Sequence, residues 1–215
     1  MPTRPRGDQA VHIAATLREE ILSGVLPPGT ALGQEDIAKR FSISRIPVRE
    51  ALRLLERDGL ASIIANKGAR VTPLTIEDLN EISEMRIASE TLALSRAVPN
   101  LSNAHLDQAA EVQTRLEGAP SCMFGPLNAE FHRILYAPAK RPRLLAHIET
   151  LSLLSERYLR RVTETLDHSD QSHREHHMIL SACNARDTDH AVATLTDHIK
   201  KAADALRQQM RDLES

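Results

Sequence analysis

The spacing of apolar residues changes once along the chain, near residue 73. In residues 10–72, short apolar stripes of helical period alternate with two β-prone stretches, 60–64 and 69–72. From residue 76 onward, one helical stripe follows another, and turn signals separate them. We therefore expect a mainly α-helical protein, with a small N-terminal unit followed by an all-α antiparallel helical bundle.

The stretch from Ser44 to Leu60, S-R-I-P-V-R-E-A-L-R-L-L-E-R-D-G-L, has a pronounced local pattern. Its apolar residues recur at helical spacing: Val48, Leu52 and Leu55. Its arginines recur every fourth residue: Arg45, Arg49, Arg53 and Arg57. Ser44 suits the N-cap, because its hydroxyl can accept from free amides of the first turn, and Pro47 falls within that turn. Such a basic helix suits the major groove of DNA, although a lone one is more often a solvated face.

The flanking segments favour the DNA-binding interpretation. Residues 34–41 predict a short helix joined by a tight turn to the arginine-bearing helix, which is the helix-turn-helix arrangement. Residues 10–23 predict the preceding helix, and 30–32 a short strand. After Gly59, the two β-prone stretches predict a hairpin with Asn66-Lys67-Gly68 at its tip, where Lys67 could reach phosphate. A surface hairpin without that role is the alternative.

Composition sharpens this division of the chain. Residues 1–72 contain eleven Lys and Arg against eight Asp and Glu, whereas 73–215 contain sixteen against twenty-one. A basic first part fits a nucleic-acid-binding module. We expect a flexible arm over 1–9, a winged helix-turn-helix over 10–72, a linker over 73–75 and a helical domain over 76–215. The lack of a membrane-length apolar run and of a signal peptide predicts a cytoplasmic protein with no membrane partner.

The second part predicts six helices, near 76–98, 103–117, 125–137, 141–166, 170–185 and 188–213. Nine of the ten histidines lie in this part. Asn128 and His132 are four residues apart and share a helix face, whereas His176 and His198 belong to later helices. Imidazole suits Zn²⁺ or Ni²⁺. Each histidine alone is more often a surface or hydrogen-bonded core residue, and spacing does not settle whether three helices converge.

The N-terminal motifs resemble those of the GntR family of bacterial transcription regulators. The matching runs are I-L-S-G-V-L-P-P-G-T-A-L, I-A-K-R-F-S-I-S-R-I-P-V-R-E-A-L and N-K-G-A-R-V. The resemblance implies a dimer that binds double-stranded DNA at a palindromic operator. The residues expected to form the DNA-binding surface are Ser44, Arg45, Pro47, Arg49, Arg53, Lys67 and Gly68. Ile46 replaces a usual Thr, and Glu35 stands where some relatives have Arg, so the operator sequence is not implied.

The C-terminal segments resemble the FCD ligand domain of the FadR-type subfamily. These segments are D-L-N-E-I-S-E-M-R-I-A-S-E, N-A-E-F-H-R-I-L and E-H-H-M-I-L-S-A-C-N-A-R-D. The resemblance implies a divalent metal ion, Zn, Ni or similar, held by Asn128, His132, His176 and His198, with His177 as a neighbour that does not bind it. It also implies that Arg86 faces an effector cavity. An ion pair of Arg86 with Glu90 is the alternative that spacing alone suggests.

Asn128 departs from the Asp that relatives often carry, so all four implied ligands are neutral. We expect either weaker metal retention or completion of the charge by an anionic effector. The overall hypothesis is a homodimeric regulator, usually a repressor in this subfamily, that responds to a small carboxylate effector. Two alternatives are a metal sensor, and a metalloenzyme with Glu130 or Glu175 as base. We do not expect an enzyme, because no nucleophile–base pairing stands out.

Overall fold

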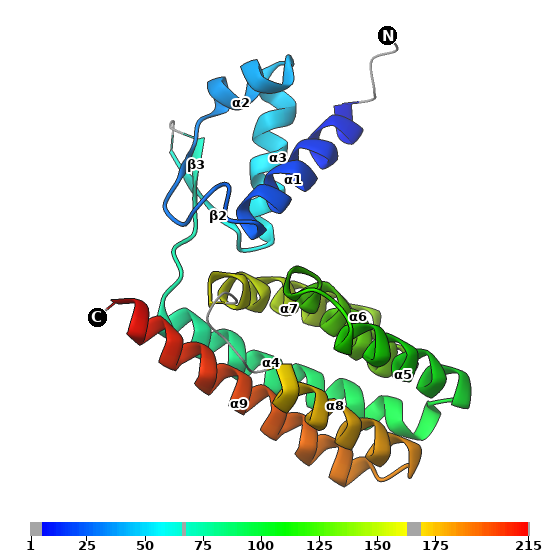
Figure 1. The fold of residues 1–215 in the computed structure, drawn as a ribbon. Helices are drawn as coiled ribbons and strands as arrows, with labels where there is room; N and C mark the ends of the chain where they lie inside the picture. Colours follow the sequence, from blue (N-terminus) through cyan, green and yellow to red (C-terminus); the bar gives the residue numbers. More distant parts are fainter. Residues whose placement is uncertain (1–5, 66–67, 163–168, 215) are drawn as a thin grey trace. The chain divides into compact units, whose positions relative to one another are not determined.

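The computed structural model describes residues 6–65, 68–162 and 169–214. Contacts divide the chain into two compact units, residues 1–74 and 75–215 (Figure 1). The first unit contains, in order, α1 (Arg6–Leu22), β1 (Ala31–Leu32), α2 (Gln34–Phe41), α3 (Arg45–Arg57), β2 (Ala61–Ile64) and β3 (Gly68–Val71). The strands form one antiparallel sheet in the order β1-β3-β2. This is the expected winged helix-turn-helix.

Helix α3 is fixed by an apolar face and by a glycine at its end. Val48, Ala51, Leu52 and Leu55 are each 1% exposed or less, and α3 packs against α1. After the helix, Gly59 has a φ of +72°, a conformation that glycine adopts without steric cost. The amide of Leu60 then donates to the Leu55 carbonyl (2.9 Å), which closes the helix end.

Two expectations about this unit are wrong in detail. Helix α1 begins at Arg6, so residues 6–9 belong to the helix and not to a flexible arm. Asp8 lies in the first turn, where a carboxylate stabilises the helix dipole. Ser44 does occupy the N-cap of α3 with extended backbone, but its hydroxyl makes no capping hydrogen bond.

The second unit is a bundle of six helices in the described residues, with bounds close to those predicted. They are α4 (Ile76–Ala97), α5 (Asn103–Glu117), α6 (Phe124–Tyr136), α7 (Pro142–Val162), α8 (Ser169–Asn184) and α9 (Thr188–Glu214). Thr75 caps α4, since its side chain accepts from the Asp78 amide at 3.1 Å. The predicted extension of α7 to residue 166 lies outside the described residues.

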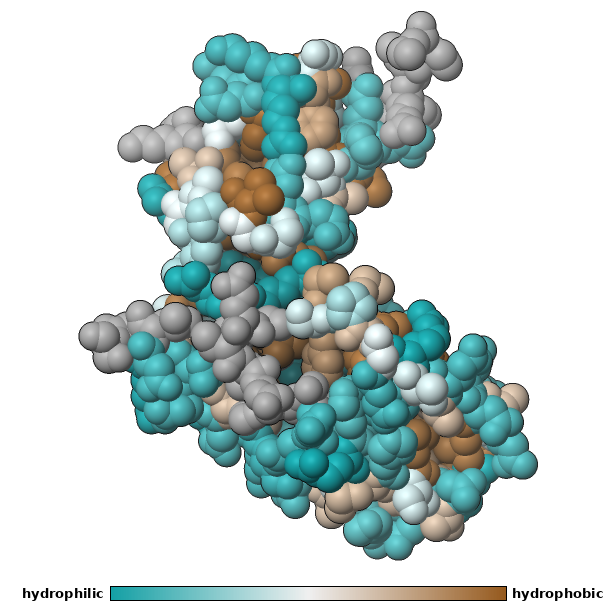
Figure 2. All heavy atoms as spheres, in the orientation of Figure 1, coloured by the Kyte–Doolittle hydropathy of each residue, from teal (hydrophilic) through white to brown (hydrophobic). Residues whose placement is uncertain are grey.

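Helix packing in the bundle brings the inner faces of α6, α8 and α9 together. Helix α4 packs against α7 and α9, α5 packs against α6 and α8, and α8 packs against α9 (Figure 1). The core between them is apolar, with Phe131, Leu135, Ile179 and Leu195 wholly buried. The visible surface is mainly hydrophilic, with small apolar areas (Figure 2). Among the described residues, we find no helix that is long and apolar enough to cross a membrane.

Candidate DNA-binding surface and metal centre

The arginines of α3 lie on its solvent-exposed face. The side chains of Arg45, Arg49, Arg53 and Arg57 are between 54% and 73% exposed. Arg45 pairs with Glu35 of α2 at 2.8 Å, and Arg53 pairs with Glu50 at 3.1 Å. Ion pairs this exposed stabilise a fold by only about 0–1 kcal/mol, so DNA phosphates or bases can replace the carboxylates. The exposed arginine face is compatible with insertion into the major groove.

The other four predicted DNA-binding residues differ in where they lie. Ser44 is exposed beside the arginines and is available to a ligand. Pro47 is buried, so its side chain belongs to the packing of α3 and not to an exposed DNA-binding surface. Lys67 lies outside the described residues. Gly68 opens β3 with a φ of +101°, and a Cβ placed on it would lie 2.3 Å from the carbonyl oxygen of Leu32. Gly68 therefore holds the wing against β1.

We expect Gly68→Ala to destabilise the DNA-binding unit by about 2–5 kcal/mol, because the added methyl must displace the β1 backbone and adopt an unfavourable φ. Gly24→Ala is the matched control: Gly24 also has a positive φ, of +78°, but nothing lies within 4 Å of its added Cβ. Urea unfolding of both variants checks this. Equal losses of stability would contradict the close approach at Gly68.

Three histidines converge in the centre of the bundle. His132 of α6, His176 of α8 and His198 of α9 are at most 5% exposed. One potential ligand atom from each lies within 4.8 Å of those of the other two. The ring centroids of His132 and His176 are 5.1 Å apart, and those of His176 and His198 are 4.9 Å apart. The structure thus brings together the three predicted histidine ligands, which sequence spacing did not determine.

Each of these imidazoles has a hydrogen-bond partner at Nδ1. His132 Nδ1 lies 3.1 Å from the Tyr136 hydroxyl, which itself donates to Glu90 at 2.7 Å, so the hydroxyl is left to accept from His132. His198 Nδ1 lies 2.8 Å from Glu175 Oε2, which can only accept when ionised. Both rings therefore carry their proton on Nδ1, which leaves the lone pair of Nε2 free for a metal ion.

The third imidazole, His176, is oriented by Gln113. Its Nδ1 lies 2.7 Å from Gln113 Oε1. The amide orientation of Gln113 follows from its nitrogen, which donates to the Glu117 carboxylate at 2.9 Å. His176 must therefore donate from Nδ1, as His132 and His198 do. The neighbouring His177 is exposed and pairs with Glu117 at 2.7 Å, so it lies outside the cluster, as expected.

The buried polar atoms without a partner fit a metal ion. Among the described residues, these atoms include Asn128 Oδ1, His132 Nε2 and His176 Nε2. A buried polar group without a partner costs about 1–3 kcal/mol, so the two unpartnered imidazole nitrogens of the cluster indicate a missing common partner. Three imidazole nitrogens and an amide oxygen suit Zn²⁺, Ni²⁺ or a similar divalent ion. The predicted set, Asn128, His132, His176 and His198, is therefore able to hold one.

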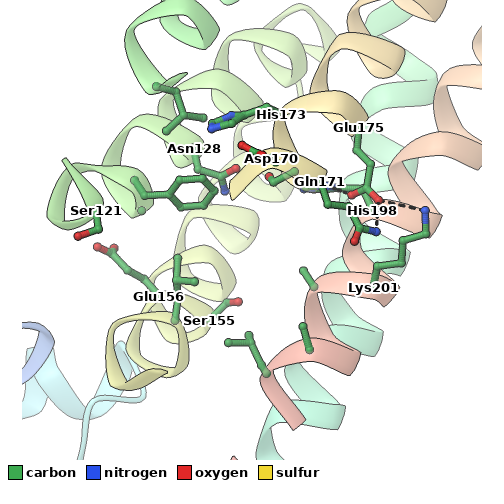
Figure 3. A pocket seen from close by; sticks show the side chains of 18 of the residues that line it. Ser121, Asn128, Ser155, Glu156, Asp170, Gln171, His173, Glu175, His198 and Lys201 are labelled. Carbon is green, nitrogen blue, oxygen red and sulfur yellow. Dashed lines mark hydrogen bonds and ion pairs between the residues drawn. The ribbon is translucent and has the colours of Figure 1, made fainter. Parts of the chain in front are cut away.

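A cavity of about 630 Å³ lies beside the cluster within the bundle. Asn128 and His198 line it, together with Ser155, Glu156 and Lys201 (Figure 3). Arg86 also lines it, while its Nε donates to Glu90 at 2.7 Å and its Nη1 to Ser155 at 3.0 Å. Arg86 thus both lines a cavity and forms the ion pair with Glu90, while its contact with an effector stays a prediction. A ligand in this cavity would meet two of the candidate metal ligands and three cationic side chains, Arg86, Arg174 and Lys201, together with four carboxylates, those of Glu117, Glu156, Asp170 and Glu175.

Family comparisons agree with both halves of this description. The family described as bacterial regulatory proteins, gntR family, matches residues 9–71, and the FCD domain family matches residues 81–201. The chain belongs to the GntR family. Because the FCD match covers more than half of the chain and includes all three clustered histidines, this GntR protein is of the FadR type, with an FCD domain at its C-terminus.

The chain matches individual transcriptional regulators over most of their length. The chain is 30% identical over 205 residues to the HTH-type transcriptional regulator BphR of Paraburkholderia xenovorans, covering 89% of this chain and 82% of BphR. It is 27% identical to the HTH-type transcriptional repressor RspR of Escherichia coli, covering 96% and 91%. The structure of E. coli McbR/YncC has the same fold, with a TM-score of 0.79, 24% identity and coverage of 98% and 100%. This GntR chain is a transcriptional regulator and not an enzyme.

The two carboxylates considered as enzymatic bases are unsuited to that role. Burial raises the pKa of Glu175, but hydrogen bonds from His198, Gln171 and Lys201 outweigh burial and lower it to about 2. Glu130 is paired with Arg115 at 3.7 Å and does not line the cavity. Neither carboxylate is placed as a general base, which agrees with the regulatory assignment.

The sequence did not predict four residues of this GntR site as partners of the clustered histidines: Glu90, Gln113, Tyr136 and Glu175. Tyr136 lies four residues after His132 on one helix face, a spacing that could have indicated it. Glu90 was considered only as the partner of Arg86. Gln113 of α5 has no such signal, because its contact with His176 joins residues 63 positions apart.

The metal-free protein is expected to lose stability as the pH falls below about 6.5. Burial, followed by repulsion from the other histidines, lowers the pKa of His132 and of His176 well below 6.5. The unfolded chain therefore takes up these protons first, and the free energy of unfolding falls by up to about 2.7 kcal/mol per pH unit, about 1.36 for each histidine. Urea unfolding between pH 7 and 5 measures this. An equally steep dependence in His176→Gln would contradict the contribution of His176.

Proposed function

We propose that this GntR regulator binds a palindromic operator as a homodimer, acts as a repressor, and releases DNA when a small carboxylate binds at a metal ion in its bundle. The observation that carries the proposal is the histidine cluster. Three buried imidazoles have their Nδ1 atoms hydrogen-bonded and their Nε2 lone pairs available, beside a cavity of about 630 Å³. Repression is supported by the name of RspR, which matches along nearly the whole chain.

The neutral ligand set and the position of Arg86 support a carboxylate effector. All four implied ligands, Asn128 and the three histidines, are neutral, so a bound ion would keep both of its positive charges. The lining adds three cations, Arg86, Arg174 and Lys201, beside the carboxylates of Glu117, Glu156, Asp170 and Glu175. A carboxylate can bind a divalent ion and accept hydrogen bonds from a guanidinium at the same time. The ion would supply electrostatic attraction, while Arg86 would orient the effector.

The effector can change DNA binding only through different affinities for two arrangements of the protein. In the DNA-bound arrangement, Arg45 and Arg49 of both subunits would meet the two operator half-sites, with Arg53 and the wing residues Lys67 and Gly68 near phosphate. Effector binding in the bundle would favour another placement of the two DNA-binding units. The reciprocal expectation is that operator DNA weakens effector binding by the same factor.

One experiment tests the operator, the metal and the carboxylate effector together. Duplexes selected from a random pool give the operator, and fluorescence anisotropy follows its affinity with Zn²⁺ and a panel of small mono- and dicarboxylates. We expect dissociation only when both the metal and a carboxylate are present. The variant His132→Ala should bind DNA normally and fail to respond. Release of DNA by a chelator alone would instead identify a metal sensor, which is the alternative.

A further inference from the structure

The proposed metal-binding side chains are neutral, but two buried carboxylates lie behind them, Glu175 one hydrogen bond from His198 and Glu90 two hydrogen bonds from His132. Asn128 and three imidazoles offer a divalent ion no negative charge, and a buried cation without nearby anions is costly. Glu175 is 7% exposed and Glu90 is 2% exposed. Both carboxylates accept a hydrogen bond from the side of the cluster: Glu175 of α8 from His198, and Glu90 of α4 from Tyr136. The charge that the donor set lacks is therefore present in the surrounding layer.

Glu175 reaches the cluster directly. Its Oε2 accepts from His198 Nδ1 at 2.8 Å, and its Oε1 accepts from Lys201 at 3.0 Å and from Gln171 at 3.0 Å. Figure 3 shows the Glu175 carboxylate between His198 and Lys201. A carboxylate bonded to the Nδ1 proton makes the imidazole a stronger donor at Nε2 and fixes the ring orientation.

Glu90 reaches the cluster through a tyrosine. Its Oε2 accepts from the Tyr136 hydroxyl at 2.7 Å, and that oxygen lies 3.1 Å from His132 Nδ1. Its other oxygen accepts from Arg86 at 2.7 Å. The Tyr136 hydroxyl thus transmits the polarising effect of the carboxylate to His132. The third histidine differs, because His176 bonds to the neutral amide of Gln113.

We propose that Glu175 and Glu90 are positioning residues that supply the negative charge missing from the ligands, Glu175 through His198 and Glu90 through Tyr136 and His132. This inference rests on the proposed metal site. It explains how a site with Asn128 in place of a carboxylate retains a divalent ion. It also predicts an unequal set of ligands, in which His132 and His198 are the stronger donors and His176 the weaker one.

The test measures metal affinity, with Zn²⁺ and a chromophoric chelator in competition, on the full chain. We expect Glu175→Gln to lower the affinity about 10–100-fold, the usual effect of an outer-shell partner. Glu90→Gln also deprives buried Arg86 of its counter-ion and can unfold the bundle. Tyr136→Phe avoids this, because it leaves the Glu90–Arg86 pair in place while removing the bridge to His132. We expect Tyr136→Phe to weaken binding about tenfold.

A rescue separates the charge from a merely structural role. Asn128→Asp moves a negative charge into the ligand set. We expect the double variant, Asn128→Asp with Glu175→Gln, to bind Zn²⁺ at least tenfold more tightly than Glu175→Gln alone. The Co²⁺ absorption spectrum, which reports the ligand field, should change in Glu175→Gln and Tyr136→Phe. Asp204→Asn is the matched control, because Asp204 is 68% exposed on α9 and pairs with Arg207 away from the cavity.

The outcomes are distinguishable from failure of the proposed function. If the unmodified chain binds no Zn²⁺, the metal site itself is wrong. If it binds Zn²⁺ but both Glu175→Gln and Tyr136→Phe stay within twofold of it, the metal site stands and the outer-shell inference is overturned. Failure of Asn128→Asp to restore affinity in Glu175→Gln would likewise overturn the role assigned to charge.

Discussion

Alanine in place of His176 is expected to abolish metal binding, with a loss of affinity of more than about 100-fold, because removal of a direct ligand exceeds the 10–100-fold effect of an outer-shell change. His176 is wholly buried, and its Nε2 has no other partner among the described residues. The metal-dependent gain in stability should vanish with it, about 2.7 kcal/mol when the free metal is 100 times its dissociation constant.

The adjacent histidine provides the control. His177 is 59% exposed and pairs with Glu117, so His177→Ala should retain both metal and the stability gain. Metal content after dialysis and thermal unfolding with and without Zn²⁺ measure the two variants side by side. A similar loss in both would show that metal binding does not depend on the buried cluster.

Arg49→Ala is expected to weaken operator binding by about 1–3 kcal/mol, or about 5- to 150-fold, and to relax the sequence preference at one position of each half-site. Arg49 lies near the start of α3 and is 54% exposed, with only a 3.8 Å contact to the neighbouring Glu50. Little of the fold depends on it. The loss should therefore appear in DNA binding and not in stability.

Arg57→Ala is the matched control for the recognition helix. Arg57 belongs to the same arginine series but lies at the end of α3, where it is 73% exposed and 3.5 Å from Asp58. We expect it to weaken binding by less than about 1 kcal/mol and equally for all sequences, as a phosphate contact does. Operator affinity is measured by gel-shift titration. If Arg49→Ala bound the operator as tightly as the unmodified protein, α3 would not be the base-reading helix.

The fold was predictable because apolar period, turns and caps are local properties. The bounds of α2 and α5 match the expected ranges, and those of α4 and α9 differ by one residue at one end. The start of α1 was missed, because a segment with Pro and Gly has a weak helical signal. The burial of Pro47 was missed as well, since a proline in the first turn fits either a packed or an exposed face.

The candidate metal site was predictable only as a set of ligands implied by resemblance. Helical spacing shows which face His132 shares with Asn128, but it cannot show which helices meet. The convergence of α6, α8 and α9 depends on packing between distant segments. The hydrogen-bond partners of the histidines depend on this packing still more, since Gln113 and Glu175 contact histidines that lie on other helices. Such partners follow from three-dimensional structure alone.

The most direct test of the account is a crystal structure of the protein purified without chelators, with anomalous scattering measured at the absorption edges of zinc and nickel. We expect one strong peak per chain, bonded to Nε2 of His132, His176 and His198 and to Oδ1 of Asn128. No peak at the cluster, in crystals grown with excess Zn²⁺, would contradict it. A peak bonded through Nδ1 atoms would contradict the hydrogen-bond assignments from which the site was built.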